Sequence, residues 1–246
     1  MTIDKAQLKA LWKEAFGDPD GFIDAFLSTA FSESRCRCIT EDGHIVAALY
    51  WLDCSCRGKK LAYIYAVATA KAYRGKGLCR SLMADTHCHL ARLGYAGAIL
   101  VPGSKELFSL YEKMGYRTCS GVMQINSEKG ERKAALTPLD KQTYAALRRQ
   151  FLPEGGVLQE GENLDFLASY AKLYRGQDFL LAAYTEKNTL HGVELLGNAT
   201  AAPGIVAALG ADRGQFRTPG EELPFAMYLS LTEDLPMPAY FGIAFD

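Results

Sequence analysis

A helix between two buried strands is the feature that most restricts how this chain can fold. Residues 61–69 (LAYIYAVAT) and 96–101 (AGAILV) are apolar runs of strand length. Between them we expect a helix from Gly77 to about residue 93, because leucines recur on one face and Gly94 is a good stop. A helical crossover joins strands within one layered sheet, so we predict the α/β class with a mixed sheet.

Other segments of the first half fit the same layer. Glu41-Asp42-Gly43 is a turn signal between β-leaning residues and predicts a hairpin of residues 35–40 and 44–54. Apolar residues at helical or strand spacing predict helices at 4–16, 20–31 and 105–114 and a strand at 116–126.

The second half repeats the mixture of helices and strands. Helices are expected near 138–151, 163–174 and 202–209, and strands near 178–185, 189–196, 224–231 and 239–245. Charge rises and apolar residues vanish in SEKGERKA, residues 127–134. We therefore predict a domain at 1–126, a linker at 127–134 and a C-terminal α/β lobe at 135–246.

Composition excludes several classes of protein. The chain has 246 residues, 22% of them charged, and a formal net charge of −1, whereas a general nucleic-acid surface should be clearly basic. The N-terminal stretch MTIDKAQLKALW is polar and patterned, unlike a secretory signal, and no apolar run is long enough to span a bilayer. These features predict a cytoplasmic protein with no nucleic-acid or membrane partner.

The seven cysteines are an odd number, which fits reduced thiols better than a disulfide framework. Cys36 and Cys38 could form one half of a metal site and Cys54 and Cys56 the other, but buried reduced thiols on paired strands are the favoured interpretation. His87 and His89 point to different faces of a helix. We therefore expect no metal.

The stretch YRGKGLCRSLM, residues 73–83, places two glycines and three basic residues at the start of the crossover helix. A helix N-terminus offers unpaired N–H groups and partial positive charge, and glycine lets a ligand approach the backbone closely. Phosphate is the favoured ligand over a merely solvated basic face. A P-loop is excluded because Leu78 follows Gly77, and a Rossmann fingerprint is excluded because Arg80 occupies the third glycine position.

The segment Arg74-Gly75-Lys76-Gly77-Leu78-Cys79 resembles the [QR]-x-x-G-x-[GA] signature of the GNAT superfamily of acetyl-CoA-dependent N-acetyltransferases, with Cys79 in place of the last Gly or Ala. Residues 107–116 (LFSLYEKMGY) resemble that family's helix ending in Y-x-x-x-G-[FY]. The resemblance covers about residues 1–126. It implies the GNAT acyltransferase fold, and some relatives carry a second, degenerate GNAT-like lobe, which residues 135–246 could be.

The resemblance also implies a site and a reaction. Backbone groups of Val67 and Thr69 would pair with the pantetheine arm of acetyl-CoA, and the diphosphate would lie on the helix entrance. Tyr111 matches the family's general acid, although an aromatic residue on an apolar helical face more often belongs to the core. The cofactor-binding residues predicted in this way are Val67, Thr69, Arg74, Gly75, Lys76, Gly77, Leu78, Cys79 and Arg80.

The implied enzyme is an N-acetyltransferase that moves acetyl to a primary amine, of a small molecule or a peptide, by direct attack in a ternary complex. The alternative is a non-catalytic CoA or acyl-CoA sensor, because strand 61–69 has no Asp or Glu to act as a base. Tyr65 could relay a proton through water, and Asp246 is a candidate base if the C-terminus reaches the cleft. Because a thiol at a helix N-terminus beside Arg and Lys should have a lowered pKa, Cys79 is predicted to be the most alkylation-prone cysteine.

Overall fold

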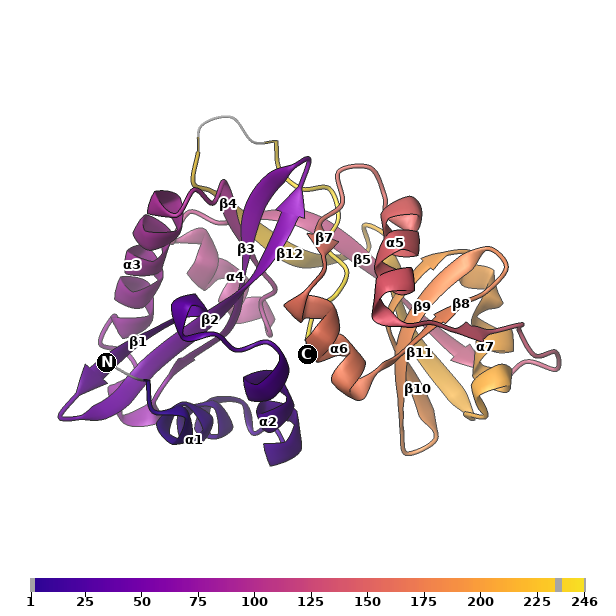
Figure 1. Ribbon diagram of the computed structural model, residues 1–246, viewed down its shortest axis with the longest axis horizontal. Helices are drawn as coiled ribbons and strands as arrows, with labels where there is room; N and C mark the ends of the chain where they lie inside the picture. Colours follow the sequence, from indigo (N-terminus) through magenta and orange to yellow (C-terminus); the bar gives the residue numbers. More distant parts are fainter. Residues whose placement is uncertain (1–2, 233–235, 246) are drawn as a thin grey trace. The chain divides into compact units, whose positions relative to one another are not determined.

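The computed structural model describes residues 3–232 and 236–245 and divides into two compact units. The first unit comprises Met1–Arg117, Gly161–Phe166 and Met227–Met237. The second comprises Thr118–Glu160, Leu167–Ala226 and Pro238–Asp246. The chain therefore passes between the units several times, as the colour sequence of Figure 1 shows.

The first unit is built on a mixed sheet in the order β1-β2-β3-β4-β12. Only the β3–β4 pair is parallel, because the crossover helix α3 connects these two strands. The strands are β1 (Cys36–Glu41), β2 (His44–Cys56), β3 (Lys59–Thr69), β4 (Gly97–Leu100) and β12 (Leu223–Ser230). The helices are α1 (Lys5–Phe16), α2 (Asp20–Thr29), α3 (Leu78–Arg92) and α4 (Lys105–Glu112).

Alternating side chains of β2 serve two separate cores in this unit. Leu49 and Trp51 belong to a buried cluster with α3 and α4, whereas Tyr50 contacts Trp12 of α1 and Phe26 of α2. This alternation follows from the two-residue period of a strand. Helices consequently cover both faces of the first sheet, and the helix entrance of α3 is held against a rigid support.

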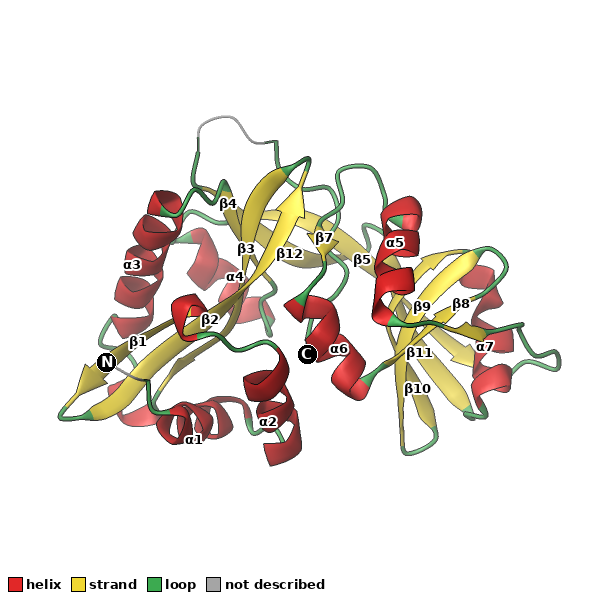
Figure 2. Ribbon diagram, viewed as in Figure 1, coloured by secondary structure: helices red, strands yellow, loops and turns green. Residues whose placement is uncertain are grey.

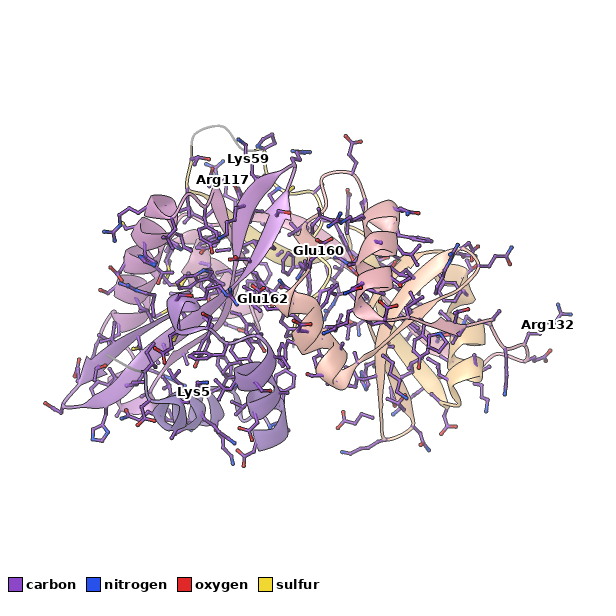
Figure 3. The ribbon with its side chains drawn as sticks, in the orientation of Figure 1. Lys5, Lys59, Arg117, Arg132, Glu160 and Glu162 are labelled. Carbon is purple, nitrogen blue, oxygen red and sulfur yellow. The ribbon has the colours of Figure 1, made fainter. Side chains whose placement is uncertain are left out.

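Within the second unit, neighbouring strands follow the order β5-β11-β10-β9-β8-β6. Helix α7 lies against β11 (Figure 2), and the exposed Arg132 extends away from the ribbon (Figure 3). The strands are β5 (Arg117–Glu128), β6 (Thr137–Pro138), β7 (Leu158–Gln159), β8 (Lys172–Arg175), β9 (Phe179–Glu186), β10 (Thr189–Gly197) and β11 (Arg213–Pro219). The helices are α5 (Lys141–Phe151), α6 (Glu162–Tyr170) and α7 (Ala202–Leu209).

The two sheets share one topological pattern. In the first unit, β1, β2 and β3 are successively antiparallel, and α3 then leads to β4, which is parallel to β3. In the second unit, β8, β9 and β10 are successively antiparallel, and α7 leads to β11, which is parallel to β10. This repeated order supports the prediction of a GNAT-like second lobe, which stays a prediction.

The compact units differ from the predicted ranges 1–126, 127–134 and 135–246. β5 continues through Glu128 and pairs with β11 along its whole length, so it belongs with the second unit. β12 pairs with β4 through its last four residues, which places Met227–Ser230 in the first unit. The start of α6 also belongs to the first unit, where Glu162 accepts a hydrogen bond from the backbone N–H of Asp53 (Figure 3).

The expected strand at 239–245 is wrong as secondary structure. The segment forms only an isolated bridge between Gly156 and Tyr240, yet its apolar side chains are buried. The Gln159 side chain replaces a strand partner, because its amide donates to the carbonyl of Ile243 at 2.6 Å and its oxygen accepts from the N–H of Ile243 at 3.0 Å. The segment is therefore held in the second unit by a side chain and by burial rather than by strand pairing.

A buried ion pair lies at the centre of the second unit. The Arg148 guanidinium of α5 donates to Glu194 of β10 at 2.6 and 2.8 Å, and the hydroxyl of Tyr240 donates to the same carboxylate at 3.1 Å. Arg148 and Glu194 are 2% and 0% exposed, so neither has water as an alternative partner. Burial opposes the charge of Arg148, but attraction to Glu194 outweighs it and raises the pKa of the guanidinium.

Replacing Arg148 with Met should lower the free energy of unfolding by about 3–5 kcal/mol, because Glu194 would remain buried without its counterion. Chemical unfolding followed by circular dichroism measures this. The neighbouring Arg149→Met is the matched control, since Arg149 pairs with Glu160 at 60% side-chain exposure and should matter little. Adding Glu194→Leu to Arg148→Met should restore part of the loss. A double variant as unstable as the single one would contradict this account.

Candidate functional site

Strands β3 and β4 separate after three paired residues. Their pairing runs from Leu61–Gly97 to Tyr63–Ile99, and β4 ends at Leu100 whereas β3 continues to Thr69. The edge of β3 from residue 64 onward therefore has no partner from β4. Val67 and Thr69, the residues predicted to contact a pantetheine arm, lie on this segment.

A β-bulge in β3 accompanies the separation. Between the pairs Tyr50–Tyr65 and Ala48–Ala68, β3 contains one residue more than β2. Ala66 lies inside this bulge with φ of +48°, a left-handed conformation that is uncommon for a residue with a side chain. A bulge bends the strand and increases its twist, so it turns the end of β3 away from β4.

The turn between β3 and α3 is held by its own side chains and by α1. The Arg74 guanidinium donates through Nε to the carbonyl of Thr69 at 3.1 Å, and Glu14 of α1 accepts from the N–H of Lys71 at 2.6 Å. Lys76 lies over the ring of Tyr73, with Nζ 4.5 Å from the centroid. The carbonyl of Thr69 therefore already has a partner, and Arg74 fixes the loop.

Two glycines shape the entrance of α3. Gly75 and Gly77 have φ of +77° and +80°, and nothing lies within 4 Å of the position that a Cβ would take at either residue. These left-handed conformations favour glycine, and the open space leaves the backbone accessible. Gly77 is also the N-cap residue, so the accessible loop leads directly into the first turn of the helix.

The first turn of α3 presents free hydrogen-bond donors. Within the described part of the chain, no side chain caps this helix, and the Ser81 N–H is the donor that reaches the Gly77 carbonyl, at 3.0 Å. The N–H groups of residues 78–80 precede that bond and have no acceptor inside the helix. The first turn contains no acidic residue, and Lys76 and Arg80 are exposed beside it. The entrance is an anion-binding arrangement suited to phosphate.

The equivalent entrance in the second unit lacks these features. The Asn198 side chain accepts from the N–H of Thr200 at 3.0 Å, and Pro203 supplies no N–H in the first turn of α7. The linker segment lies against the same turn, because Gly130 and Ala134 donate to the carbonyls of Pro203 and Gly204. We therefore assign the phosphate-binding geometry to α3.

The predicted low pKa of Cys79 is wrong. Its side chain packs against the core of the first unit rather than facing the loop, and burial raises the pKa of the thiol. A helix N-terminus lowers the pKa of a thiol only if the sulfur faces the free N–H groups. The sulfur of Cys79 instead lies in an apolar surrounding, which raises its pKa. Cys88, on the same helix, is the exposed thiol of this unit.

Tyr111 lies in the core behind the helix entrance. Its ring contacts that of Tyr116, with centroids 5.8 Å apart, and its hydroxyl has no hydrogen-bond partner among the described residues. Burial raises the pKa of the phenol, and the nearby Cys79 adds to the shift. The hydroxyl therefore stays protonated at neutral pH, as a proton donor must.

A second layer behind Tyr111 was not anticipated from the sequence. The hydroxyl of Tyr116 lies 2.8 Å from Nε2 of His87 of α3, and burial lowers the pKa of His87 to about 4. A neutral imidazole thus fixes Tyr116, which in turn packs on Tyr111. No local pattern indicates this contact, because His87 and Tyr116 are 29 positions apart.

Among the described residues of the first unit, neither predicted candidate is placed to act as a general base. Tyr65 is 9% exposed and lies among the rings of Trp12, Phe26 and Phe166. Asp246, the other predicted candidate, lies outside the described residues. Within the described ranges, no group of three or more His, Cys, Asp or Glu side chains is placed to hold a metal ion. No helix there is both long and apolar enough to cross a membrane.

Comparisons with known proteins agree with this geometry. Residues 3–119 match the family model described as an acetyltransferase (GNAT) domain. Among solved structures, a GCN5-related N-acetyltransferase from Anabaena variabilis matches with a TM-score of 0.70 and 14% identity, covering 92% of this chain and 70% of its own. A Kribbella flavida GCN5-related N-acetyltransferase matches with a TM-score of 0.67 and 16% identity, covering 93% and 69%.

A third structure is similar in length as well. A GCN5-related N-acetyltransferase from Sphaerobacter thermophilus matches with a TM-score of 0.56 and 12% identity, covering 97% of both chains. At these identities the likeness establishes the fold, and it extends well beyond residue 119. No curated protein matches the sequence.

Thiol labelling tests the corrected view of Cys79. With N-ethylmaleimide at pH 8 and peptide mass spectrometry, Cys88 should react before Cys79, because Cys88 is exposed whereas burial holds the thiol of Cys79 protonated. Unfolding in urea should bring the two rates together. Faster labelling of Cys79 in the native protein would show that its thiol faces the helix entrance after all.

Proposed function

From the match of residues 3–119 to the acetyltransferase (GNAT) domain model, we propose that the protein transfers an acetyl group from acetyl-CoA to a primary amine. The observation that carries the proposal is the pairing of two features in the first unit. The separated edge of β3 lies directly before an uncapped helix entrance that has open glycines and no acidic residue. Acetyl-CoA fits both features, because the amide groups of its pantetheine arm can pair with the edge of β3 and its diphosphate can bind at the entrance of α3.

The cofactor would use the backbone more than side chains. Backbone groups of β3 near Val67, which have no partner from β4, can pair with the amides of the pantetheine arm, as a strand partner would. The N–H groups of residues 75–80 then receive the diphosphate. Lys76 and Arg80 add charge beside it. Because the Thr69 carbonyl is occupied by Arg74, we assign the pairing of the arm chiefly to the Val67 segment.

The reaction needs a nucleophile, an oxyanion donor and an acid. The neutral amine attacks the thioester carbonyl, an unpaired N–H of β3 stabilises the oxyanion, and the C–S bond breaks as the thiolate leaves. Tyr111 donates its proton to that thiolate. The phenol is protonated beforehand, and because burial raises its pKa and makes it a weaker acid, the role depends on its position beside the leaving thiolate. The amine loses its proton to water or to a base that we do not assign.

A CoA sensor without catalysis is the competing function. It is favoured by the absence of Asp and Glu from β3 and by the burial of Tyr111. The two functions differ in turnover. An enzyme should release free CoA rapidly with one class of amine in a panel of small amines and peptides, whereas a sensor should release it slowly with all of them.

Tyr111→Phe should reduce kcat by roughly 10²–10⁴ while leaving the KM for acetyl-CoA nearly unchanged, because only the transfer of a proton to the thiolate is lost. Release of free thiol in the presence of the preferred amine measures both constants. Tyr116→Phe is the matched control, since it removes an equally buried hydroxyl of the same cluster that we give no part in proton transfer.

Equal losses of kcat in the two variants would show that the cluster serves packing alone. An unchanged kcat in Tyr111→Phe would remove Tyr111 from the mechanism. No amine-dependent turnover by the folded wild-type protein, despite acetyl-CoA binding, would favour the sensor.

A further inference from the structure

The second unit contains a pocket that the proposed reaction does not use. Its volume is about 230 Å³, and it lies on the face of the sheet opposite α7. Four strands line it: β5, β9, β10 and β11. The lining residues are Val122, Gln124, Tyr184, His191, Gly192, Val193, Gln215 and Arg217.

The pocket lies where β10 and β11 separate. Their parallel pairing runs from Thr189–Arg213 to Gly192–Phe216 and then stops. Between Gly192 and Glu194, β10 has one residue more than β9, which is a bulge at the point of separation. The first unit has the same arrangement, because β3 contains a bulge near the point where it separates from β4. The pocket therefore occupies the second unit's counterpart of the gap assigned above to the pantetheine arm.

Cross-strand pairing explains which side chains meet in this gap. Tyr184, His191 and Gln215 are direct neighbours across β9, β10 and β11, so they form one row on one face. Arg217 and Gln124 are paired across β11 and β5 and form the next row. Phe216, which lies between Gln215 and Arg217, and Leu190, which precedes His191, point to the opposite face and pack with α7.

The lining has a definite chemical character. Arg217 is cationic, and its guanidinium is held over the ring of Phe225, 4.5 Å from the centroid. Gln124 and Gln215 offer amide groups at the exposed rim, and none of the lining residues is acidic. The rings of Tyr184 and His191 are stacked at 5.0 Å with an interplanar angle of 16°, and Val122 and Val193 are buried apolar neighbours.

We propose that this pocket binds a small, flat carboxylate. The guanidinium of Arg217 and the glutamine amides match the oxygens of a carboxylate, and the stacked rings with the valines match a planar apolar body. A volume of about 230 Å³ suits a small molecule better than a whole coenzyme, and the segment of Gly130 and Ala134 lies against the first turn of α7. The site is independent of the acetyl-CoA site and does not rest on the proposed function.

An NMR titration of the full-length protein with benzoate, benzamide and benzamidine tests the charge preference. The three probes share one ring and differ in charge. Benzoate should shift the signals of the His191 ring and the Gly192 amide, benzamide should bind more weakly, and benzamidine should leave them unchanged. Equal binding of all three, preference for benzamidine, or no benzoate binding would overturn the proposal.

Two variants locate the binding. Arg217→Gln should weaken benzoate binding by about tenfold or more, because a charge-assisted hydrogen bond is lost. Arg213→Gln removes the same charge from the same strand, but Arg213 bonds Thr189 outside the pocket, so binding should persist. Gln215→Glu is a second test at an exposed position that should fold normally and should repel benzoate. Benzoate binding that survives both Arg217→Gln and Gln215→Glu would place it elsewhere and refute the assignment.

Discussion

The parting of two parallel strands is the constraint on which this structure depends. Parallel pairing needs a crossover helix, and α3 satisfies it with only three paired residues on each strand. Pairing with β4 stops at Tyr63, the bulge at Ala66 follows, and the edge of β3 from residue 64 onward has no partner from β4. Buried backbone groups require partners. The gap is therefore better suited to a ligand with amide groups of its own than to further side chains.

The same device occurs twice, with different outcomes. In the first unit the gap leads to a glycine-rich, uncapped helix that can receive a diphosphate. In the second unit Asn198 caps the 3-10 turn Ala199–Ala201 that precedes the corresponding helix, the segment around Gly130 lies against the first turn of that helix, and polar side chains line the gap. On our proposals, one topology yields a site for an extended cofactor in the first unit and for a small molecule in the second, depending on the residues at the helix entrance.

The sequence predicted the elements with strong periodicity or turn chemistry. The helix expected near 202–209 matches α7, and the hairpin expected from Glu41-Asp42-Gly43 matches β1 and β2. It missed β11, because RGQFRTP alternates an inner Phe216 with polar residues that line an open pocket. It also placed β12 in the second lobe alone, since the pairing of Met227 with Leu100 joins residues 127 positions apart.

Within the site, features that depend on a local motif were predictable from the sequence, whereas features that depend on contacts between distant residues were not. The accessible glycines and the basic helix entrance were evident from residues 73–83. The protonated state of Cys79 and the His87–Tyr116 contact depend on which side chains are buried, and one sequence does not contain that information.

Calorimetric titration with acetyl-CoA tests the central claim most directly. Wild type should bind one acetyl-CoA per chain, and Gly77→Asp should lose binding because it adds a side chain and a negative charge at the diphosphate position. Gly94→Asp is the matched control, since Gly94 ends the same helix with a similar φ of +79° and equally open surroundings. Binding by wild type and Gly94→Asp but not by Gly77→Asp is the predicted result. Undiminished binding by folded Gly77→Asp, or none by wild type, would contradict the assignment of the cofactor to the α3 entrance.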